Sequence, residues 1–196
     1  AAVAALPRGH LLRYMNTGEL AHDITAVIDD AHEGVEGITT VHHFADGGRV
    51  ISTGSINVAG TAFTLRTTQK LQAHIPLLLH PKPRLVCQIG FGSGETSRIV
   101  CSYGIERLDL VEISRAVIDM ADRHFRDING GVTADPRFRA IIMDGANYLR
   151  LTGERYDIIM NDSIWPYYAG NSGLYTREYF EAAKGRLLPG GIMTSW

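Results

Sequence analysis

Residues 85–96 read LVCQIGFGSGET, in which a short apolar run passes directly into three glycines at alternate positions. An apolar run without alternation indicates a strand that is covered on both faces, as in a parallel sheet. Gly90, Gly92 and Gly94 allow a tight turn of the backbone and let a ligand approach it closely. A strand-to-helix turn without a ligand would also need glycine, so the loop becomes informative only through its place among the other elements.

The chain after this loop alternates strands with helices. Apolar runs predict further strands at 108–113, 138–143, 156–160 and from 190 onward, and the spacing between them predicts helices from 95, over 115–125, near 146–151 and over 177–187. This alternation predicts an α/β fold, a doubly wound Rossmann-like sheet of the class I methyltransferase type. The last predicted strand stands at the end of the sequence, so we expect the C-terminal strands of such a sheet to be missing.

The sequence before Pro81 has a different pattern. Short apolar alternations around 24–28, 39–44 and 49–52 are separated by turn signals. The Asp-Gly-Gly triplet at 46–48 is a strong hairpin signal, because glycine tolerates positive φ. We therefore predict a small antiparallel β lobe at residues 1–66, followed by the Rossmann-like domain at residues 67–196.

A helix is predicted at the start of the second domain. Helical spacing from about residue 67 places Leu71, Ile75, Leu78 and Leu79 on one side. The prolines at 81 and 83 end this helix, because proline lacks the N–H that a helix needs and restricts the residue before it.

Polar side chains stand at the predicted strand ends, where open parallel sheets bind their ligands. Glu112 ends the second strand about 20 residues beyond the central glycine, the place of an acidic group that accepts ribose hydroxyls. Asp144 and Gly145 end the third strand, where a carboxylate and a backbone N–H can meet an adenine, although Asp144 can also cap the next helix. Asp162 follows the fourth strand and would face the reacting end of the ligand. The four strand ends together predict a nucleoside site.

The loop departs from the dinucleotide fingerprint, which requires G-x-G-x-x-G. Its glycines fall at alternate positions, and Thr96 and Ser97 occupy the later places. Strand-end carboxylates and a short loop suit a nucleoside that carries a cationic sulfonium rather than a diphosphate. We therefore expect S-adenosylmethionine or its decarboxylated form in preference to NAD.

Composition limits the possible functions. The 196 residues include 19 basic and 21 acidic side chains, carry a formal net charge of -2, and are 45% hydrophobic. This balance gives no electrostatic reason to expect a nucleic-acid or anionic-membrane partner. The sequence contains no apolar run of the roughly 18 residues that span a bilayer.

Cysteines and histidines are interpreted as structural. Cys87 falls in an apolar strand and Cys101 in a predicted helix, so both are expected to be reduced and to act as small hydrophobic residues. His42 and His43 have no acidic or cysteine partner nearby in the sequence. We predict that both lie at the surface and that the chain holds no metal.

The order of short motifs resembles that of the spermidine synthase family, the polyamine aminopropyltransferases. The matching segments are 84–94, 109–113, 129–131, 135–137, 144–145, 156–159, 162–163, 173–180 and 188–191, together with 69–77 and 80–83, which resemble the family's gate helix and its entry into the first strand. The resemblance covers about residues 61–196. The stretch DSIWPYYAG at 162–170 most resembles the divergent bacterial branch of the family, some members of which are fused to membrane-spanning regions.

The resemblance implies roles for individual residues. The implied cofactor-binding residues are Gln69, Gly90, Gly92, Ser93, Gly94, Glu112, Asp144 and Gly145. Within this set Glu112 would hold the ribose, Asp144 and Gly145 the adenine, and Gln69 the tail of the nucleoside. Asp162 would be the general base that takes a proton from the attacking amine.

The implied substrate residues are aromatic: Trp165, Tyr167, Tyr168 and Tyr175. The first three could form a cage for a cationic substrate or a lid that packs over the site, and the sequence does not separate these possibilities.

Three positions depart from the family. An aspartate of the glycine loop that grips the aminopropyl amine is replaced by Ser93, a second aspartate three positions after the base by Trp165, and the tyrosine before Gln69 by Thr68. Each lost contact to an ammonium is worth roughly 1.5–3 kcal/mol. We therefore predict weak or absent spermidine synthesis from putrescine, and a preference for a bulkier, more apolar or less charged amine.

The implied function is transfer of an aminopropyl group from decarboxylated S-adenosylmethionine to an amine acceptor, by a cytoplasmic homodimer. Two alternatives stay open. Methyl transfer from S-adenosylmethionine is favoured by Ser93, which leaves room for a carboxylate-bearing tail. The other alternative is a non-catalytic nucleoside-binding module of a membrane-fused protein.

Overall fold

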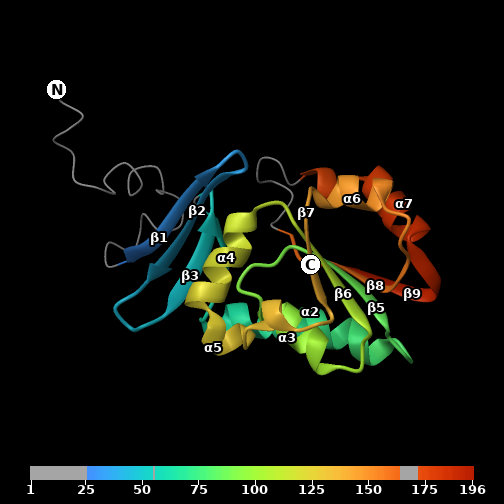
Figure 1. The fold of residues 1–196 in the computed structure, drawn as a ribbon, viewed down its shortest axis with the longest axis horizontal. Helices are drawn as coiled ribbons and strands as arrows, with labels where there is room; N and C mark the ends of the chain where they lie inside the picture. Colours follow the sequence, from blue (N-terminus) through green and yellow to red (C-terminus); the bar gives the residue numbers. More distant parts are fainter. Residues whose placement is uncertain (1–25, 55, 164–171) are drawn as a thin grey trace.

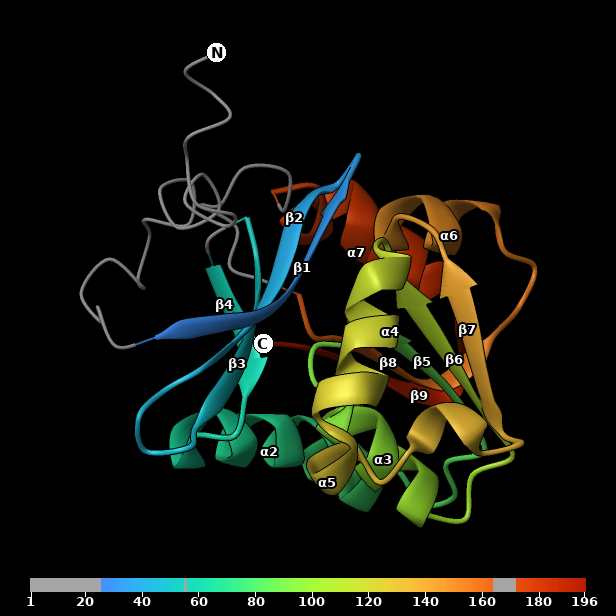
Figure 2. The same ribbon diagram turned by 60° about the vertical axis from the view of Figure 1, so that its left-hand side comes forward.

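Two sheets lie side by side in the computed structural model, which describes residues 26–54, 56–163 and 172–196 (Figure 1). One sheet is antiparallel with strand order β1-β2-β3-β4, and the other has the order β7-β6-β5-β8-β9. Helix α4 stands between the two sheets in both ribbon views (Figures 1 and 2). The predicted fold class, a Rossmann-like sheet preceded by a small antiparallel lobe, is confirmed.

The antiparallel sheet is a meander. Its strands are β1 (Val27–Gly34), β2 (Gly37–His43), β3 (Arg49–Thr53) and β4 (Ile56–Gly60). The predicted hairpin turn joins β2 to β3, where the Gly48 N–H donates to Asp46 Oδ1 at 2.8 Å and Gly47 has a φ of 83°. The turn therefore forms for the reason that the sequence suggests, since glycine adopts positive φ at little cost.

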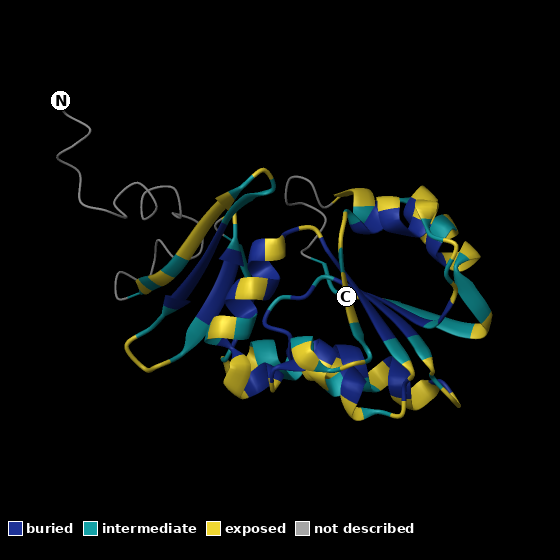
Figure 3. Cartoon of the chain, viewed as in Figure 1, coloured by how far each residue is buried: buried dark blue, intermediate teal, exposed yellow. Residues whose placement is uncertain are grey.

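The second sheet is parallel, and helices cover it on both faces. Its strands are β5 (Leu85–Ile89), β6 (Arg107–Glu112), β7 (Phe138–Ile142), β8 (Tyr156–Asn161) and β9 (Leu187–Ser195). The helices are α2 (Phe63–Leu79), α3 (Glu95–Ser102), α4 (Arg115–His124), α5 (Arg126–Asn129), α6 (Gly145–Leu151) and α7 (Arg177–Gly185), with short 3₁₀ turns η3 (Val132–Ala134) and η4 (Ser172–Tyr175). The central strands are buried along their length (Figure 3).

Neighbouring residues of the central strands pack into different cores. Val86 belongs to a cluster with residues of α2, α3 and α4, whereas Cys87 packs with residues of α6 and α7. Side chains alternate between the faces of a strand, so a strand covered on both faces needs apolar residues at consecutive positions. This requirement explains the uninterrupted apolar runs in the sequence.

Helix α2 begins at Phe63, four residues before the predicted start, so the predicted boundary at residue 66 falls inside it. The side that carries Leu71, Ile75, Leu78 and Leu79 is not the buried side: Leu78 is 72% exposed and Leu79 69% exposed. The buried residues of α2 include Gln69 and Gln72 instead. The helix thus turns a partly polar face toward the parallel sheet.

The lobe and the parallel sheet share one apolar core. Val41 and Ile51 of the antiparallel sheet belong to the same buried cluster as Phe91 and Val117. Polar contacts reinforce this junction, since Arg49 on β3 donates to the backbone oxygen of His124 at 2.8 Å and pairs with Asp127.

Two expectations about individual side chains have different outcomes. Cys87 and Cys101 are free and buried, as predicted. The prediction that His42 lies at the surface is wrong: it is 2% exposed on β2, beside Thr40, and burial lowers its pKa. His43, the next residue, lies on the other face of the strand and contacts Asp29 at 2.7 Å.

Candidate functional site

The glycine loop joins β5 to α3 at the carboxyl edge of the parallel sheet. Gly90, Gly92 and Gly94 all have positive φ, at 93°, 55° and 83°. A Cβ on Gly90 would stand 2.4 Å from the backbone oxygen of Asp162, and a Cβ on Gly92 would stand 2.9 Å from the Cβ of Ala59 on β4. The loop therefore needs glycine both for its backbone conformation and for its close approach to β8 and to the lobe.

Glu112, at the end of β6, holds this loop in place by hydrogen bonding. Its carboxylate accepts the Phe91 N–H at 2.9 Å and the Ser114 N–H at 3.0 Å. The residue is 8% exposed, and burial raises the pKa of its carboxyl against the opposing effect of these backbone hydrogen bonds. The Ile113 N–H also favours its charged form by hydrogen bonding, and since a carboxylate has about four lone-pair positions, one position is left for a ligand hydroxyl.

Asp162 follows β8 and lies against the same loop. Its backbone N–H donates to the Ile89 oxygen at 2.9 Å, and its Oδ2 lies 3.3 Å from the Thr96 hydroxyl. Removal of the carboxylate from water raises its pKa to about 7, although hydrogen bonds from Gln72 and Thr96 favour the charged form. A carboxyl with this proton affinity can accept and return a proton near neutral pH.

Gln69 and Ser93, both predicted to bind the cofactor, contact each other. The Ser93 hydroxyl donates to Gln69 Oε1, and the Gln69 amide donates to the Leu65 oxygen at 3.1 Å. Ser93 is fully buried, and its backbone oxygen accepts the Asn129 amide at 3.0 Å. The glycine loop is thus held from both α2 and α5.

Asp144 and Gly145 mark the end of β7 and the start of α6. Asp144 caps the helix by accepting the Asn147 N–H at 2.8 Å through Oδ1. A Cβ on Gly145 would stand 2.6 Å from Ile89 Cγ2, so any other residue at this position requires the Ile89 side chain to move. The role of Asp144 as the cap of α6 is therefore confirmed.

The predicted aromatic substrate residues are only partly described. Tyr175 lies beside the site, with its hydroxyl 3.1 Å from the Ser163 backbone oxygen and 3.2 Å from that of Trp196. Trp165, Tyr167 and Tyr168 lie outside the described residues.

Three residues at the site were not identified from the sequence. Gln72 and Thr96 contact Asp162, and the charge of Glu36, at the turn between β1 and β2, contributes to the raised pKa of Glu112. Burial is the main cause of the raised pKa of both Glu112 and Asp162, and the charge of Glu112 adds a smaller contribution at Asp162. Mutual repulsion of this kind favours a cationic ligand.

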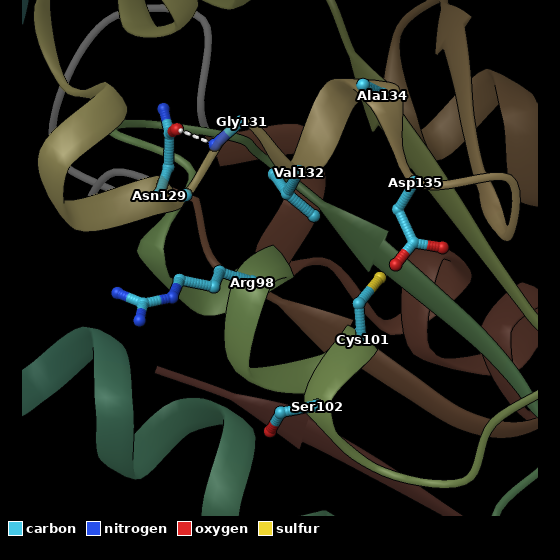
Figure 4. A pocket seen from close by; sticks show the side chains of 9 residues that line it. Arg98, Cys101, Ser102, Asn129, Gly131, Val132, Ala134 and Asp135 are labelled. Carbon is cyan, nitrogen blue, oxygen red and sulfur yellow. Dashed lines mark hydrogen bonds between the residues drawn. The ribbon is translucent and has the colours of Figure 1, made fainter.

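A surface pocket of about 370 Å³ lies elsewhere, between α3 and the segment that follows α5 (Figure 4). Its lining includes Arg98, Cys101 and Asp135 but none of the predicted site residues. Asn129 belongs to its wall, where it accepts the Gly131 N–H at 2.9 Å. Asn129 also donates to the backbone oxygen of Ser93, so the pocket adjoins the glycine loop but is lined by other residues than those predicted to bind the cofactor.

No cluster of three or more metal-ligating side chains occurs within 26–54, 56–163 and 172–196. In the same part of the chain, no helix has the length and apolar character that a membrane crossing requires.

The parallel sheet and the polar groups at its carboxyl edge define a Rossmann-like ligand-binding domain of the class I methyltransferase type. Residues 66–195 match the model of the spermine/spermidine synthase domain, and the chain belongs to that family. The predicted resemblance is confirmed.

Curated relatives agree with this assignment. The polyamine aminopropyltransferase of Serratia proteamaculans (strain 568) is 34% identical over 127 residues, which make up 64% of this chain and 44% of that protein. The polyamine aminopropyltransferase of Erwinia tasmaniensis is 33% identical with the same coverage. The chain thus spans less than half the length of the curated relatives that it matches.

Solved structures agree as well. A spermidine synthase in complex with the transition state analogue AdoDATO has a TM-score of 0.76 and 26% identity, with 86% of this chain and 57% of that chain covered. The spermidine synthase from Thermotoga maritima has a TM-score of 0.75 and 26% identity, with 86% and 56% covered.

Proposed function

We propose that the chain is the nucleoside-binding part of an aminopropyltransferase that transfers the aminopropyl group of decarboxylated S-adenosylmethionine to an amine. The observation that carries this proposal is the Asp162 carboxyl, with a pKa raised to about 7, beside the glycine loop that Glu112 fastens. Membership of the spermine/spermidine synthase family supports the same reaction.

The donor would lie along the carboxyl edge of the sheet. Glu112 would accept a ribose hydroxyl, Asp144 and the Gly145 N–H would meet the adenine, and Gln69 with Ser93 would line the place of the tail. The repelling carboxylates Glu112 and Asp162 support a donor that carries a positive sulfonium.

The reaction forms one bond and breaks one bond. The lone pair of the amine nitrogen attacks the propyl carbon next to sulfur and forms a C–N bond. The C–S bond breaks, its electron pair stays on sulfur, and methylthioadenosine leaves as a neutral thioether. The nitrogen loses a proton, which Asp162 accepts when its carboxyl is charged.

The acceptor is an amine other than a simple diamine. Ser93 is buried and uncharged, and its hydroxyl is occupied by Gln69, so it supplies no negative charge for the amine of the donor's aminopropyl group. The expectation of poor putrescine use rests on Trp165, which stands in the place of the second aspartate. The family resemblance further leads us to propose a homodimer in the cytoplasm, either free or attached to a membrane-spanning region.

Donor and acceptor panels test the proposal. The chain is incubated with decarboxylated S-adenosylmethionine or with S-adenosylmethionine, each labelled in the transferable group, and with putrescine, longer alkylamines and aryl amines. We expect aminopropyl transfer to a non-putrescine amine, abolished in Asp162→Asn. Methyl transfer alone would replace the proposed reaction, and nucleoside binding without transfer from either donor would favour a non-catalytic module. Light scattering at micromolar concentration tests the homodimer.

A further inference from the structure

Asn129, the last residue of α5, has no exposed surface and uses every polar group of its side chain. Its amide nitrogen donates to the backbone oxygens of Ser93 and Ala121, each at 3.0 Å. Its Oδ1 accepts the Gly131 N–H at 2.9 Å (Figure 4). One side chain therefore connects the glycine loop, helix α4 and the turn that follows α5.

Only an amide can make this set of contacts. The oxygens of Ser93 and Ala121 need donors, and the side-chain nitrogen of Asn129 supplies two N–H groups. An ionised aspartate in its place has no donor and would bring a buried charge against two carbonyl oxygens. Because a buried charge without a partner is strongly unfavourable, the glycine loop would lose this connection to α4 and α5.

The residue that follows Asn129 makes such an exchange chemically accessible. Asn129 is the one asparagine of the sequence that precedes a glycine, and Gly130 has no side chain to hinder attack by its own backbone nitrogen. That nitrogen gives up its proton to water and forms a bond with Asn129 Cγ. The bond from Cγ to the side-chain nitrogen breaks, and this nitrogen takes up a proton and leaves as ammonia. Water then opens the resulting succinimide ring and leaves aspartate or isoaspartate, so water is the only co-reactant.

The folded structure opposes this reaction through a small number of contacts. The Gly130 N–H donates to the Arg126 oxygen at 2.9 Å, and the Asn129 amide is held by its own partners. These contacts belong to a helix of a single turn, Arg126–Asn129. Gly130 is exposed, and the surface pocket of about 370 Å³ is lined by Asn129, Gly130 and Gly131. Local opening of this turn would therefore admit water without unfolding of the sheet.

We propose that the Asn129-Gly130 pair is a deamidation site controlled by the glycine loop: the closed loop protects Asn129, and deamidation of Asn129 releases the loop. The inference goes beyond the proposed function, and only its ligand dependence rests on the nucleoside site. A nucleoside bound to the glycine loop favours the closed state and slows the modification. The modified chain does not return to the closed state, because that state would bury the new charge without a donor.

Peptide mass spectrometry of aged protein measures the modification directly. The full chain is kept at mildly alkaline pH either free, with methylthioadenosine, or in urea. We expect deamidation of Asn129 to be fastest in urea and at least about tenfold slower in the folded chain. Saturating methylthioadenosine should slow it by a further factor of about ten, because opening then requires release of the ligand. Equal rates in urea and in the folded chain would show that the structure does not control this site.

Asn129→Asp reproduces the modified side chain, and Asn57→Asp is the matched control. The control adds the same charge on β4, where Asn57 Oδ1 accepts the Ser52 hydroxyl and a carboxylate oxygen can do the same. Asn129→Asp should weaken methylthioadenosine binding at least about tenfold and speed hydrogen exchange of the backbone amides at 91–96. Asn57→Asp should change neither.

The pH response separates a lost donor from general damage. A protonated aspartic acid has one O–H that can donate to the Ser93 oxygen, so the binding defect of Asn129→Asp relative to wild type should lessen toward about pH 5. Asn129→Leu has a similar shape but no proton to gain, and its defect should stay the same. Identical pH profiles for the two variants would contradict the role of the Asn129 amide.

The outcomes keep the inference apart from the proposed function. Wild-type protein that does not bind methylthioadenosine contradicts the proposed function, while the comparison with urea and the hydrogen exchange of Asn129→Asp still decide the role of Asn129. Exchange and ligand affinity equal to wild type in Asn129→Asp would overturn the inference. Should this variant fail to fold, wild-type protein that deamidates while folded, separated by its added negative charge, provides the modified chain. Unchanged exchange at 91–96 in that fraction would overturn the inference in the same way.

Discussion

Arg139 on β7 and Asp109 on β6 face each other across neighbouring strands and form a two-point ion pair, with both nitrogen–oxygen distances at 2.8 Å. Asp109 is fully buried and also accepts the Tyr156 hydroxyl at 2.7 Å. The Asp109 carboxylate therefore links the strands β6, β7 and β8 through side-chain contacts. Asp109 lies within its strand and has no exposed surface, whereas Glu112 and Asp162 stand at the ends of their strands.

Asp109→Ala should strongly destabilise the fold. The substitution removes a fully buried carboxylate that accepts from Tyr156 and from Arg139, and each hydrogen bond to such a charged group is worth about 1.5–3 kcal/mol. The Arg139 side chain is 48% exposed, so water can replace its lost partner. Urea denaturation measures the loss. Asp119→Ala, which removes the partner of Arg115 in an exposed pair on α4, is the control and should change stability by less than about 1 kcal/mol. Equal effects of the two substitutions would contradict this interpretation.

Glu112→Ala should weaken methylthioadenosine binding more than tenfold, about 1.4 kcal/mol. The loss has two sources, since the variant removes the proposed ribose acceptor and also the carboxylate that holds the Phe91 N–H. Glu112→Gln keeps one oxygen for the loop and should lose less. Calorimetry measures both variants, and an unchanged dissociation constant in Glu112→Ala would remove this residue from the nucleoside site.

Asp162 should impose a pH dependence on the reaction. Because burial raises its pKa to about 7, the charged base accumulates only above that pH, and kcat/KM should rise through pH 7 and then level off. Asp162→Asn should show little activity at any pH. A wild-type profile that stays flat between pH 6 and pH 8 would exclude Asp162 as the general base.

The Asp162 carboxyl should also make the stability of the fold depend on pH, and stability should decrease with rising pH whereas activity increases. The folded state keeps a proton on Asp162 up to about pH 7, whereas the unfolded chain loses it near its ordinary value of 3.8. The contribution of Asp162 to stability is thus fully present below the ordinary value and is lost as pH rises through 7. Asp162→Asn should therefore raise the melting temperature at pH 8 more than at pH 5, and a reversed order would show that another group controls this range.

Gly90→Ala should displace the base. Its added Cβ would meet the Asp162 backbone oxygen at 2.4 Å, and the φ of 93° disfavours a side chain. We expect loss of stability together with at least a tenfold loss of transfer activity. Gly104→Ala is the matched control, because a Cβ there meets nothing within 4 Å. If both variants behave alike, the contact between the loop and β8 has no special role.

The sequence predicted the parallel sheet well because buried strands need consecutive apolar residues. The strand ends could be located in the same way, and they place Glu112, Asp144 and Asp162 at one edge. The start of α2 was not predictable, since Ala62 provides no side-chain cap to mark it. The burial of His42 was missed because two adjacent histidines give no alternation that identifies the inward face.

The contacts of the base were missed for a different reason. Gln72 stands 90 positions before Asp162 in the chain, and helical spacing on α2 drew attention to its apolar side. That side is largely exposed, and the glutamines point inward. Only the fold shows which side of such a helix meets the sheet.

The shared core bears on how the chain unfolds. Val41 and Ile51 of the lobe are completely buried together with Phe91 of the glycine loop and residues of the parallel sheet. Neither part can lose its structure without exposing apolar surface of the other, so the two sequence patterns belong to a single cooperative unit. A ligand that stabilises the glycine loop should therefore protect backbone amides of β2 and β3 from hydrogen exchange, although these strands carry none of the predicted ligand-binding residues.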